Sequence, residues 1–590
     1  MLNRLILITV LLAASTTMQA GILQRGKVQL ICHRTANRDA PENTLESLAL
    51  AARMGCNIVE VDVRTTLDGQ LVLNHDGMLE RLTDGMGDIE TSSFDELQLL
   101  DTGGFMSERF AGMLIPRFAD ALRVAREQGI GLDLDIKEKG EGAAIFAALN
   151  AAGMTERVIF GGDDHNADDL RALMPTDTDP VSWLGPDCTA AQVAAAHAQG
   201  KFVVANFSAN PHEMDLTAMR AAVAAGVDAL NVDYPRLGAE AAGRPVEAKI
   251  SALATTASTG PVEKRAAAIR ELSHYIGFPT QQLFVHWLRD PEPRISRAAA
   301  VALVLSRPSA PSQIFIDALS SDQTTARTNS AWALGILHAP ATTPLLTLLK
   351  DGDPAELKEV LLALSRCPGD VPAEVLLPFF HHATPTIRAA AALALARHQP
   401  EIAAIKVPEL LHQEEQRSAN EYAAYVRRGK PKLSQAEIDP IVEEYREHMK
   451  LVHALEELPA SKALPLLAKE AFRSAEDSSH VTATLAGYRL WDRIAANPSL
   501  AITALDSADI EAADRAEWML IKADPSVLPA VRNATLTASP ATRKRLISVL
   551  AWQGDSASLP LLNQLRQSNQ EDPQLLDWAI AKIHSQQFQP

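Results

Sequence analysis

The chain has 590 residues, a hydrophobic fraction of 47%, a charged fraction of 22% and a formal net charge of −18. These fractions are ordinary for globular domains and unlike those of disordered or fibrous chains. The negative charge argues against a general nucleic-acid or anionic-membrane binder, because both need a basic face. Four cysteines in so long a chain, none of them in a Cys-x-x-Cys pair, exclude a disulfide scaffold and a zinc ribbon.

Residues 1–20 form a unit of their own. Arg4 precedes an apolar stretch from Leu5 to Ala14, and small or polar residues follow as far as Ala20. This is the layout of a secretory signal peptide, and the apolar stretch is too short to span a bilayer comfortably. We expect a cleaved signal peptide and a mature chain outside the cytoplasm, periplasmic or secreted, with an uncleaved anchor as the alternative.

From residue 21 to 248, short apolar stretches alternate with helical patterns. Glycine is frequent here, since 22 of the 30 glycines precede residue 249, and glycine favours tight turns over helix interiors. The stretches with the length and composition of strands are Val28–Cys32, Ile58–Arg64, Leu71–Asn74, Gly131–Ile136, Val158–Phe160, Val181–Leu184, Phe202–Asn206 and Ala229–Val232. Eight strands, many alternating with helices, predict a (β/α)8 TIM barrel. The short link between the second and third strands departs from strict alternation.

Polar side chains gather where the first four predicted strands end, which is the edge where such barrels carry their active sites. These residues are His33 and Arg34, then Glu60 and Asp62, then His75 and Asp76, and finally Asp133, Asp135 and Lys137. Because side chains alternate along a strand, Glu60 and Asp62 share one face, as do the three residues of the fourth strand.

These groups favour metal-assisted cleavage of a phosphoester. Converging carboxylates repel one another unless protons or a cation neutralise them, and oxygen ligands favour Mg²⁺ or Ca²⁺ over zinc. Two histidines can act as general base and general acid near neutral pH. Arg34 offers a fork for a phosphate and Lys137 a point charge. The simpler alternative is that each group is structural, as a single strand-end histidine usually is.

Longer sequence blocks carry a resemblance. The segment from His33 to Thr44, with its Pro41-Glu42-Asn43-Thr44 ending, resembles the opening motif of the glycerophosphodiester phosphodiesterase family. The other blocks that resemble this family are Glu60-Val61-Asp62 with Asp68-Gly69, then His75-Asp76, Asp133-Leu134-Asp135-Ile136-Lys137 and Ala229–Pro235. The resemblance covers about residues 27–240.

The resemblance implies a barrel enzyme that hydrolyses glycerophosphodiesters to an alcohol and glycerol 3-phosphate with a divalent cation, Ca²⁺ or Mg²⁺. His33 would accept a proton and His75 would donate one to the leaving alcohol. The implied metal ligands are Glu60, Asp62 and Asp135, and the implied phosphate-binding residues are Arg34 and Lys137. In this family the neighbouring glycerol hydroxyl attacks and forms a cyclic phosphate. Cleavage of lysophospholipids by the same groups is a close variant.

Glu42 has two interpretations. Asn43 and Glu46 can form a capping box for the next helix, so that Glu42 points back toward the site. There it would bind substrate hydroxyls or metal-bound water, or it would only support the loop.

Three positions depart from the family pattern. Thr35 stands where glycine is usual, Asp135 stands where glutamate is usual, and the strand that ends at Asn206 lacks the family's frequent tryptophan. These departures bear on substrate choice more than on reaction type.

A different pattern begins at residue 262, after the small-residue segment 249–261, which we expect to be a linker. Ala-Leu pairs start at residues 302, 333, 363 and 394, at spacings of 31, 30 and 31, each after a turn rich in Asp, Pro or Thr. Similar units return around Trp491, Leu520 and Leu550. This period predicts an α-solenoid of HEAT-like repeats over residues 262–590. The expected architecture is therefore an α/β barrel followed by an all-α array.

The array suggests a second class of function. Repeats of this kind usually bind proteins, so a protein-binding platform with a secondary or inactive barrel is the alternative to a hydrolase. A third hypothesis is that the array limits substrate size at the barrel mouth. The basic stretch Arg427–Lys432 could contact a lipid headgroup or an anionic partner, although a solvated loop is the simpler interpretation. Cys32 and Cys56 are expected to be buried, with a disulfide between them as one option in an oxidising compartment.

Overall fold

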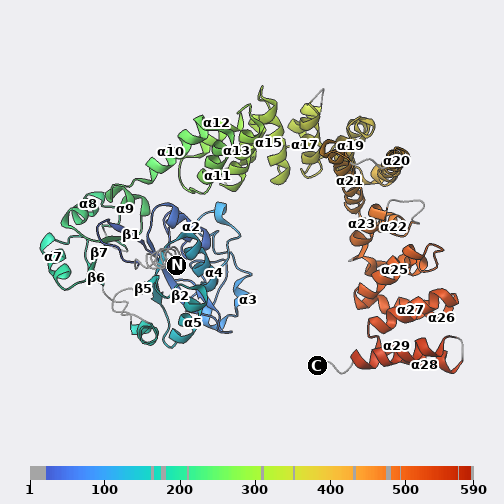
Figure 1. Ribbon diagram of the computed structural model, residues 1–590, viewed down its shortest axis with the longest axis horizontal. Coiled ribbons are helices and arrows are strands. Elements are labelled where there is room, and N and C mark those ends of the chain that lie inside the picture. Colours follow the sequence, from blue (N-terminus) through green and yellow to red (C-terminus); the bar gives the residue numbers. More distant parts are fainter. Residues whose placement is uncertain are drawn as a thin grey trace, which may run out of the picture. The chain divides into compact units, whose positions relative to one another are not determined.

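The structure is a computed structural model. It describes residues 22–586, apart from 161–164, 175–180, 209–211, 307–310, 350–352, 430–432, 474–479, 492 and 569–570. The predicted signal peptide therefore lies outside the described residues. The chain divides into two compact units, Met1–Pro311 and Ser312–Pro590, whose elements are labelled in Figure 1.

The first unit contains one sheet of eight strands. They are β1 (Gln29–Cys32), β2 (Ile58–Thr65), β3 (Leu71–Leu73), β4 (Gly131–Ile136), β5 (Val158–Phe160), β6 (Val181–Leu184), β7 (Phe202–Asn206) and β8 (Ala229–Val232). Hydrogen-bonded neighbours follow the order β5-β4-β2-β1-β8-β7-β6 and are parallel. All eight predicted strands are present, and β1 lies between β2 and β8 as the predicted TIM barrel requires. The fold class is confirmed.

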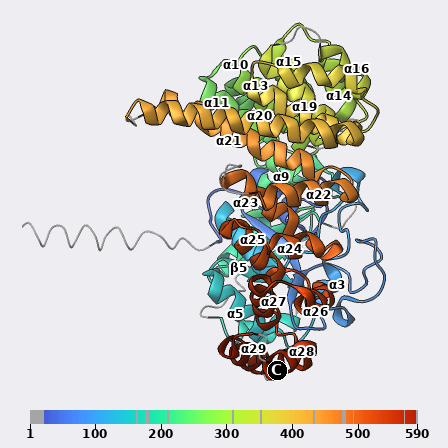
Figure 2. The same cartoon turned by 90° about the vertical axis from the view of Figure 1, so that its right-hand side faces the viewer.

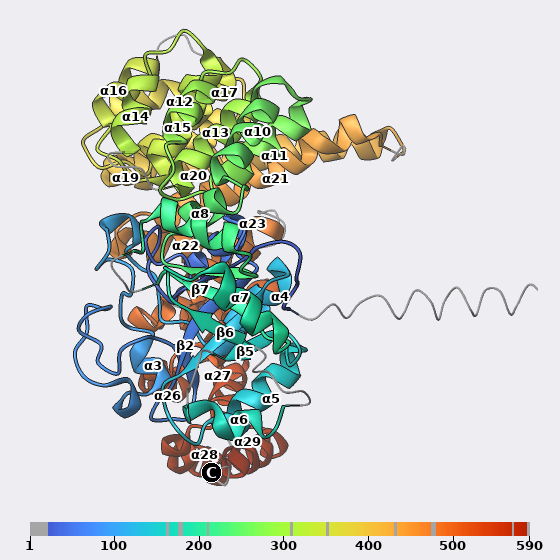
Figure 3. The same ribbon diagram turned by 90° about the vertical axis from the view of Figure 1, so that its left-hand side faces the viewer.

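The short link between the second and third strands has a simple cause. β3 pairs with β2 in the antiparallel sense, and antiparallel strands can be joined by a tight turn, whereas parallel strands need a longer crossover. Helices surround the sheet (Figures 1 and 3). They are α2 (Leu45–Arg53), α3 (Phe94–Leu97), α4 (Phe118–Gln128), α5 (Gly142–Ala152), α6 (Asp168–Arg171), α7 (Ala190–Ala198), α8 (Leu216–Ala225) and α9 (Pro235–Ala241).

Helix α2 does not begin as we predicted. The expected capping box of Asn43 with Glu46 is wrong, because Thr44 is the N-cap and accepts a hydrogen bond from the Ser47 amide. Asn43 has a φ of 57° and instead donates from Nδ2 to Asp62 Oδ2 at 2.7 Å, while its Oδ1 accepts from the Asp62 amide at 3.1 Å. The side chain of Asn43 thus pairs with the buried Asp62 on β2 and does not cap the helix.

The segment predicted as a linker is mostly helical. It lies in α10 (Val246–Thr259), which is followed by α11 (Val262–Leu272), α12 (Gln281–Leu288) and α13 (Pro293–Leu305). Tyr275 and Phe278, which follow α11, are buried in the same hydrophobic cluster as the barrel strands. The first helices of the predicted array therefore belong to the barrel unit, and the division falls at Pro311 instead of residue 261.

The second unit is helical through its described residues. Its first helices are α14 (Pro311–Ala318), α15 (Thr324–Ile336), α16 (Thr342–Leu346), α17 (Pro354–Leu364), α18 (Ala373–Leu376) and α19 (Pro385–His398). The four predicted Ala-Leu pairs lie at matching places in α13, α15, α17 and α19 and are buried. Three of these helices start with proline in the first turn. A helical repeat array is consistent with this arrangement.

Two long helices interrupt the period. α20 (Pro400–Arg427) and α21 (Gln435–Glu456) pack side by side and extend beyond their neighbours within this unit (Figures 2 and 3). The remaining helices are α22 (Ala460–Ala471), α23 (His480–Trp491), α24 (Ser499–Ala504), α25 (Ile510–Lys522), α26 (Leu528–Thr537), α27 (Pro540–Trp552), α28 (Leu559–Gln567) and α29 (Pro573–Gln586). Among the described residues, no helix combines the length and the apolar character needed to cross a membrane.

Candidate active site

The predicted polar residues meet at the carboxyl-terminal edge of the sheet. His33 follows β1, Glu60 and Asp62 lie on β2, His75 follows β3, and Asp135 lies on β4. The register places Glu60 beside Asp133 and Asp62 beside Asp135. Parallel neighbours thus bring four carboxylates onto two adjacent strands.

Three of these carboxylates form a candidate metal site. Glu60, Asp62 and Asp135 each offer an oxygen atom, and these atoms lie within 4.8 Å of one another. Burial and the nearby charge of Asp62 raise the pKa of Glu60 well above its usual range. Burial and Asp135 raise the pKa of Asp133 to about 7, and the buried Oδ1 of Asp133 has no hydrogen-bond partner. Clustered oxygen ligands that are costly to ionise together fit a hard divalent cation.

Lys137 is the positive group nearest to this cluster in the structure. Its Nζ lies 2.7 Å from Asp62 Oδ1 and 2.6 Å from Asp135 Oδ2. Burial alone would lower the pKa of Lys137, but the two carboxylates outweigh burial and raise it. The ammonium group therefore stays charged and offsets part of the repulsion.

His33 is oriented by an aspartate from the other end of the barrel sequence. Its Nδ1 lies 2.7 Å from Oδ1 of Asp233, a residue that follows β8 and is 1% exposed. Asn37 donates to the same carboxylate oxygen at 2.7 Å. With the ring proton on Nδ1 donated to Asp233, Nε2 keeps its lone pair and can accept a proton.

His75 is held from both sides. Its Nδ1 lies 2.6 Å from Asp76 Oδ1, and its Nε2 lies 2.6 Å from Nη2 of Arg34. Arginine can only donate, so Nε2 accepts from Arg34 and the ring proton on Nδ1 goes to Asp76. A hydrogen bond from Arg81 is the main cause that holds the pKa of Asp76 well below its usual range.

Glu42 lies between two arginines. Arg81 donates to both of its carboxylate oxygens, at 2.9 and 3.1 Å, and Arg34 Nη1 lies 3.6 Å from Oε1. Arg34 also donates its backbone amide to Glu60 Oε2 at 2.5 Å. Glu42 is thus part of the network that positions Arg34, which agrees with a supporting role for it.

Thr35 occupies the position where we noted a missing glycine. It is fully buried with a φ of 69°, a left-handed conformation that costs a β-branched residue free energy. Its hydroxyl lies 2.6 Å from Ser47 Oγ and accepts from the Asn43 amide at 3.2 Å. These hydrogen bonds offset the strain and direct the hydroxyl toward helix α2.

Seven of the eight predicted site residues are connected by these contacts, namely Arg34, Glu42, Glu60, Asp62, His75, Asp135 and Lys137. The eighth, His33, directly precedes Arg34 and pairs with Asp233. The roles of Asn43, Arg81 and Asp233 were not predicted from the sequence. Asp233 could have been found, because it directly follows β8, which neighbours β1. Arg81 lies in a loop, where no spacing rule indicates its direction.

Part of the first unit matches a known protein family and several known proteins. Residues 33–172 match the glycerophosphoryl diester phosphodiesterase family. A glycerophosphodiester phosphodiesterase of Caldanaerobacter subterraneus is 29% identical over 155 residues, which are 25% of this chain and 64% of the relative. A glycerophosphodiester phosphodiesterase of Bacillus subtilis is 30% identical over 104 residues, 18% of this chain and 36% of the relative. The chain thus spans less than two thirds of the length of these relatives.

Among solved structures, an Oleispira antarctica phosphodiesterase in complex with the product sn-glycerol-3-phosphate is 28% identical, with a TM-score of 0.33. The match covers 36% of this chain and 96% of that one. An enzyme described as a glycerophosphodiester phosphodiesterase, from Agrobacterium tumefaciens, is 26% identical with a TM-score of 0.32, and covers 36% of this chain and 99% of its own. The first unit is a TIM-like barrel with a carboxylate and histidine site. Its residues 33–172 form a domain of the glycerophosphoryl diester phosphodiesterase family.

Proposed function

We propose that the protein is a metal-dependent phosphodiesterase that hydrolyses glycerophosphodiesters to an alcohol and glycerol 3-phosphate. The observation that carries the proposal is the arrangement of His33 with Asp233, and of His75 with Asp76, around a cluster of three carboxylates and Arg34. The family of residues 33–172 and the names of the relatives support the same reaction class.

The chain's own residues supply acid–base catalysis and phosphate binding. A divalent cation, Ca²⁺ or Mg²⁺, held by Glu60, Asp62 and Asp135 would neutralise charge on the phosphate. His33 Nε2 takes the proton of the attacking glycerol hydroxyl, and Asp233 stabilises the resulting imidazolium. His75 takes up a proton from solvent on Nε2 and gives it to the leaving alcohol. The cyclic phosphate that this attack forms is opened by water with the roles exchanged: His75 accepts a proton from the water, and His33 returns its proton to the glycerol oxygen, which gives glycerol 3-phosphate.

Arg34 links substrate binding to the availability of His75 Nε2, the proposed proton donor. In the structure it donates to His75 Nε2, which is the nitrogen that must carry the transferred proton. A bound phosphate competes for the guanidinium fork and so releases Nε2. Lys137 supports the phosphate from the fourth strand.

The decisive test uses the mature full-length protein with glycerophosphocholine, glycerophosphoethanolamine and lysophosphatidylcholine. We expect turnover that EDTA abolishes and that Ca²⁺ or Mg²⁺ restores. His33→Ala and His75→Ala should each lower kcat by a factor of about 10² to 10⁴. His197→Ala is the matched control, because His197 pairs with Asp228 at 2.8 Å before β8, at the opposite end of the strands. Normal turnover in His33→Ala, or turnover that ignores EDTA, contradicts the proposal.

We also propose that the mature protein lies outside the cytoplasm. The layout of residues 1–20 supports this location, and so does the disulfide between Cys32 and Cys56, whose Cα atoms are 6.0 Å apart, since disulfides persist in oxidising compartments. N-terminal sequencing of the protein from a periplasmic fraction should begin at Gly21. Recovery of the intact leader in the cytoplasm contradicts the proposal.

A further inference from the structure

The last long helices of the second unit carry a row of exposed aromatic side chains. α23, α25, α27 and α29 contact one another in succession, and Figure 2 shows them one after another along this unit. Tyr488, Trp518, Trp552 and Trp578 on these helices are 65%, 55%, 49% and 40% exposed. Large aromatic side chains are normally buried, so several exposed ones on one face indicate a binding surface.

The repeat period places this row on a single face. Trp518 follows Tyr488 by 30 residues and precedes Trp578 by 60, so the three side chains occupy the same position of their repeats. In α27 that position is Ser548, and Trp552 stands one helical turn later, on the same side of the helix. Trp552 and Trp578 meet edge to face, with ring centroids 6.2 Å apart. The row therefore continues from α23 to α29.

A groove of about 350 Å³ lies between the first two of these helices. Tyr488, Trp491, Trp518 and Met519 give it apolar walls, and Glu511 and Asp514 lie at its edge. Gly487 also lines it, and a Cβ at this position would lie 4.0 Å from Met519 Cε, so glycine leaves room there. A groove of this size is within the range of small-ligand sites.

The charged groups around the groove balance one another. Glu511, Asp514 and Arg515 line the groove. Arg545, Glu517 and Lys522 are linked to the lining through ion pairs or through contact with the Trp518 ring, so that three acids stand beside three bases. Arg545 Nη1 lies 2.7 Å from Asp514 Oδ1 and 2.6 Å from Glu517 Oε2, and Lys522 Nζ lies 4.8 Å from the centre of the Trp518 ring. This set of paired charges favours neither a polyanion nor a cation. It offers fixed hydrogen-bond donors and acceptors without net charge.

We propose that this groove and the aromatic row bind a neutral glycan chain. Sugar rings present flat C–H faces that stack on aromatic rings, and their hydroxyls both donate and accept, as paired carboxylates and guanidinium groups require. A proline-rich peptide also stacks on aromatic side chains. Its prolines lack N–H groups, however, so such a segment offers acceptors alone to the ion pairs of Glu511 with Arg515 and of Asp514 with Arg545. An extended glycan that crosses the repeats meets an aromatic ring at each of these helices.

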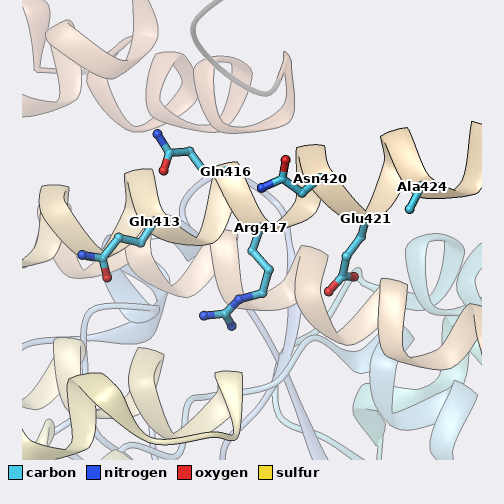
Figure 4. Close-up of a pocket in the computed structure, with 6 residues that line it drawn as sticks. All are labelled: Gln413, Gln416, Arg417, Asn420, Glu421 and Ala424. Atoms are coloured by element: carbon cyan, nitrogen blue, oxygen red, sulfur yellow. The ribbon is translucent and has the colours of Figure 1, made fainter.

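A second hollow in the same unit provides a contrast. It lies along α20 and is lined by Gln413, Gln416, Arg417, Asn420, Glu421 and Ala424, with no aromatic residue among them (Figure 4). Tyr422 on the same helix is 62% exposed, nearly as much as Tyr488. It is therefore a matched control for loss of an exposed tyrosine.

The test measures binding of cellohexaose, maltohexaose and chitohexaose to the full-length protein by titration calorimetry and tryptophan fluorescence. Decaproline and phosphatidylglycerol vesicles are tested beside them. We expect at least one hexasaccharide to bind, and we expect Trp518→Ala and Tyr488→Ala each to weaken it by about tenfold or more. Tyr422→Ala and the catalytic variant His33→Ala should bind as the parent does.

Three results overturn the proposal. One is that no hexasaccharide binds at millimolar concentration. Another is that both groove variants, shown to be folded by circular dichroism, bind with the parent's affinity. The third is that only decaproline or vesicles bind in a manner that depends on Trp518. If Trp518→Ala unfolds the array, Tyr488→Ala alone decides, because its more exposed side chain can be removed at little cost to packing. Hydrolase activity plays no part in this readout, so the two proposals fail independently.

Discussion

The two histidines of the barrel site are each paired with an aspartate. Asp233 reaches His33 across 200 residues of sequence, whereas Asp76 is the direct neighbour of His75. Both fix the ring proton on Nδ1. In the proposed mechanism the aspartates therefore determine, together with the histidines, which ring nitrogen exchanges a proton with the substrate.

Asp233→Asn should separate orientation from substrate binding. An amide can hold His33 in the wrong tautomer and cannot stabilise the imidazolium, so kcat should fall by a factor of about 10² to 10⁴ while KM changes little. Asp228→Asn, at the His197 pair, is the control and should retain activity. A rise in KM with an unchanged kcat would instead show that Asp233 only shapes the pocket.

Asp39 should make stability depend on pH. Burial raises the pKa of Asp39 to about 6, although Arg236 opposes this. Between pH 4 and 6 the folded state keeps a proton that the unfolded state has lost, so stability falls as pH rises and the loss is complete above the folded pKa. Asp39→Asn should therefore gain about 1 to 2 kcal/mol at pH 7.5 and much less at pH 4.5. Equal gains in urea unfolding at both pH values would contradict this assignment.

Individual site residues could be predicted from the sequence where a rule about neighbouring residues applied. His33, Glu60, Asp62, His75 and Asp135 follow from strand ends and the alternation of side chains. Asn43 could not be assigned correctly, because its spacing to Glu46 fits a cap while its true partner, Asp62, is 19 residues away.

Within the array, a buried ion pair joins helix α19 to helix α20. Arg388 of α19 is 3% exposed and donates to both oxygens of Glu414 on α20, at 2.7 and 2.6 Å, and to the carbonyls of His382 and Ala383. Removing one partner leaves a buried charge unpaired, which costs more than the pair contributes.

Arg388→Met should destabilise the second unit by about 3 to 5 kcal/mol without changing phosphodiesterase activity. Arg294→Met is the control, because its pair with Glu263 is on the surface and should change nothing measurable. Chemical unfolding followed by circular dichroism, with activity measured in parallel, checks both. Equal unfolding midpoints for the two variants would contradict the role of burial.

Periodicity predicted the helices of the array, because buried alanine and leucine recur at each repeat. It did not predict that segment 249–261 is helical. The threonines and serines of this segment resemble a linker in composition, yet α10 packs against α11, and packing outweighs weak local propensity.

At the scale of the whole molecule, the boundary between the units has a direct consequence. Tyr275 and Phe278 lie beyond residue 261 and are buried in the hydrophobic cluster that the barrel strands share with their surrounding helices. A chain of residues 21–311 should fold cooperatively and keep the parent's substrate preference. A chain of residues 21–248 should be insoluble or unfold at lower temperature, since burial of each aromatic ring contributes several kcal/mol, about 3 to 5 by analogy with core truncations. A stable, active 21–248 chain, or a changed substrate preference in 21–311, would contradict this.

The proposed metal site should also stabilise the barrel. Ca²⁺ at about 100 times its Kd should add about 2.7 kcal/mol to folding and raise the first thermal transition of the full-length protein. Asp62→Asn should abolish the shift, while Asp68→Asn, an exposed acid outside the carboxylate cluster, should preserve it. An equal shift in Asp62→Asn would place the cation elsewhere.

The bond between Cys32 and Cys56 bears on how the protein is produced. Cys32 directly precedes His33, and Cys56 lies two residues before β2, the strand of Glu60 and Asp62. The bond closes a loop over a sequence separation of 24 and so contributes about 3 kcal/mol through the unfolded chain. Expression in a reducing cytosol, or assay with a thiol reductant, would remove this cross-link, and the ends of β1 and β2 that carry the base and the cation ligands would be held together by strand pairing and packing alone. Low activity in such a preparation would therefore indicate a reduced disulfide first, and a defect of the catalytic residues only after the disulfide had been restored.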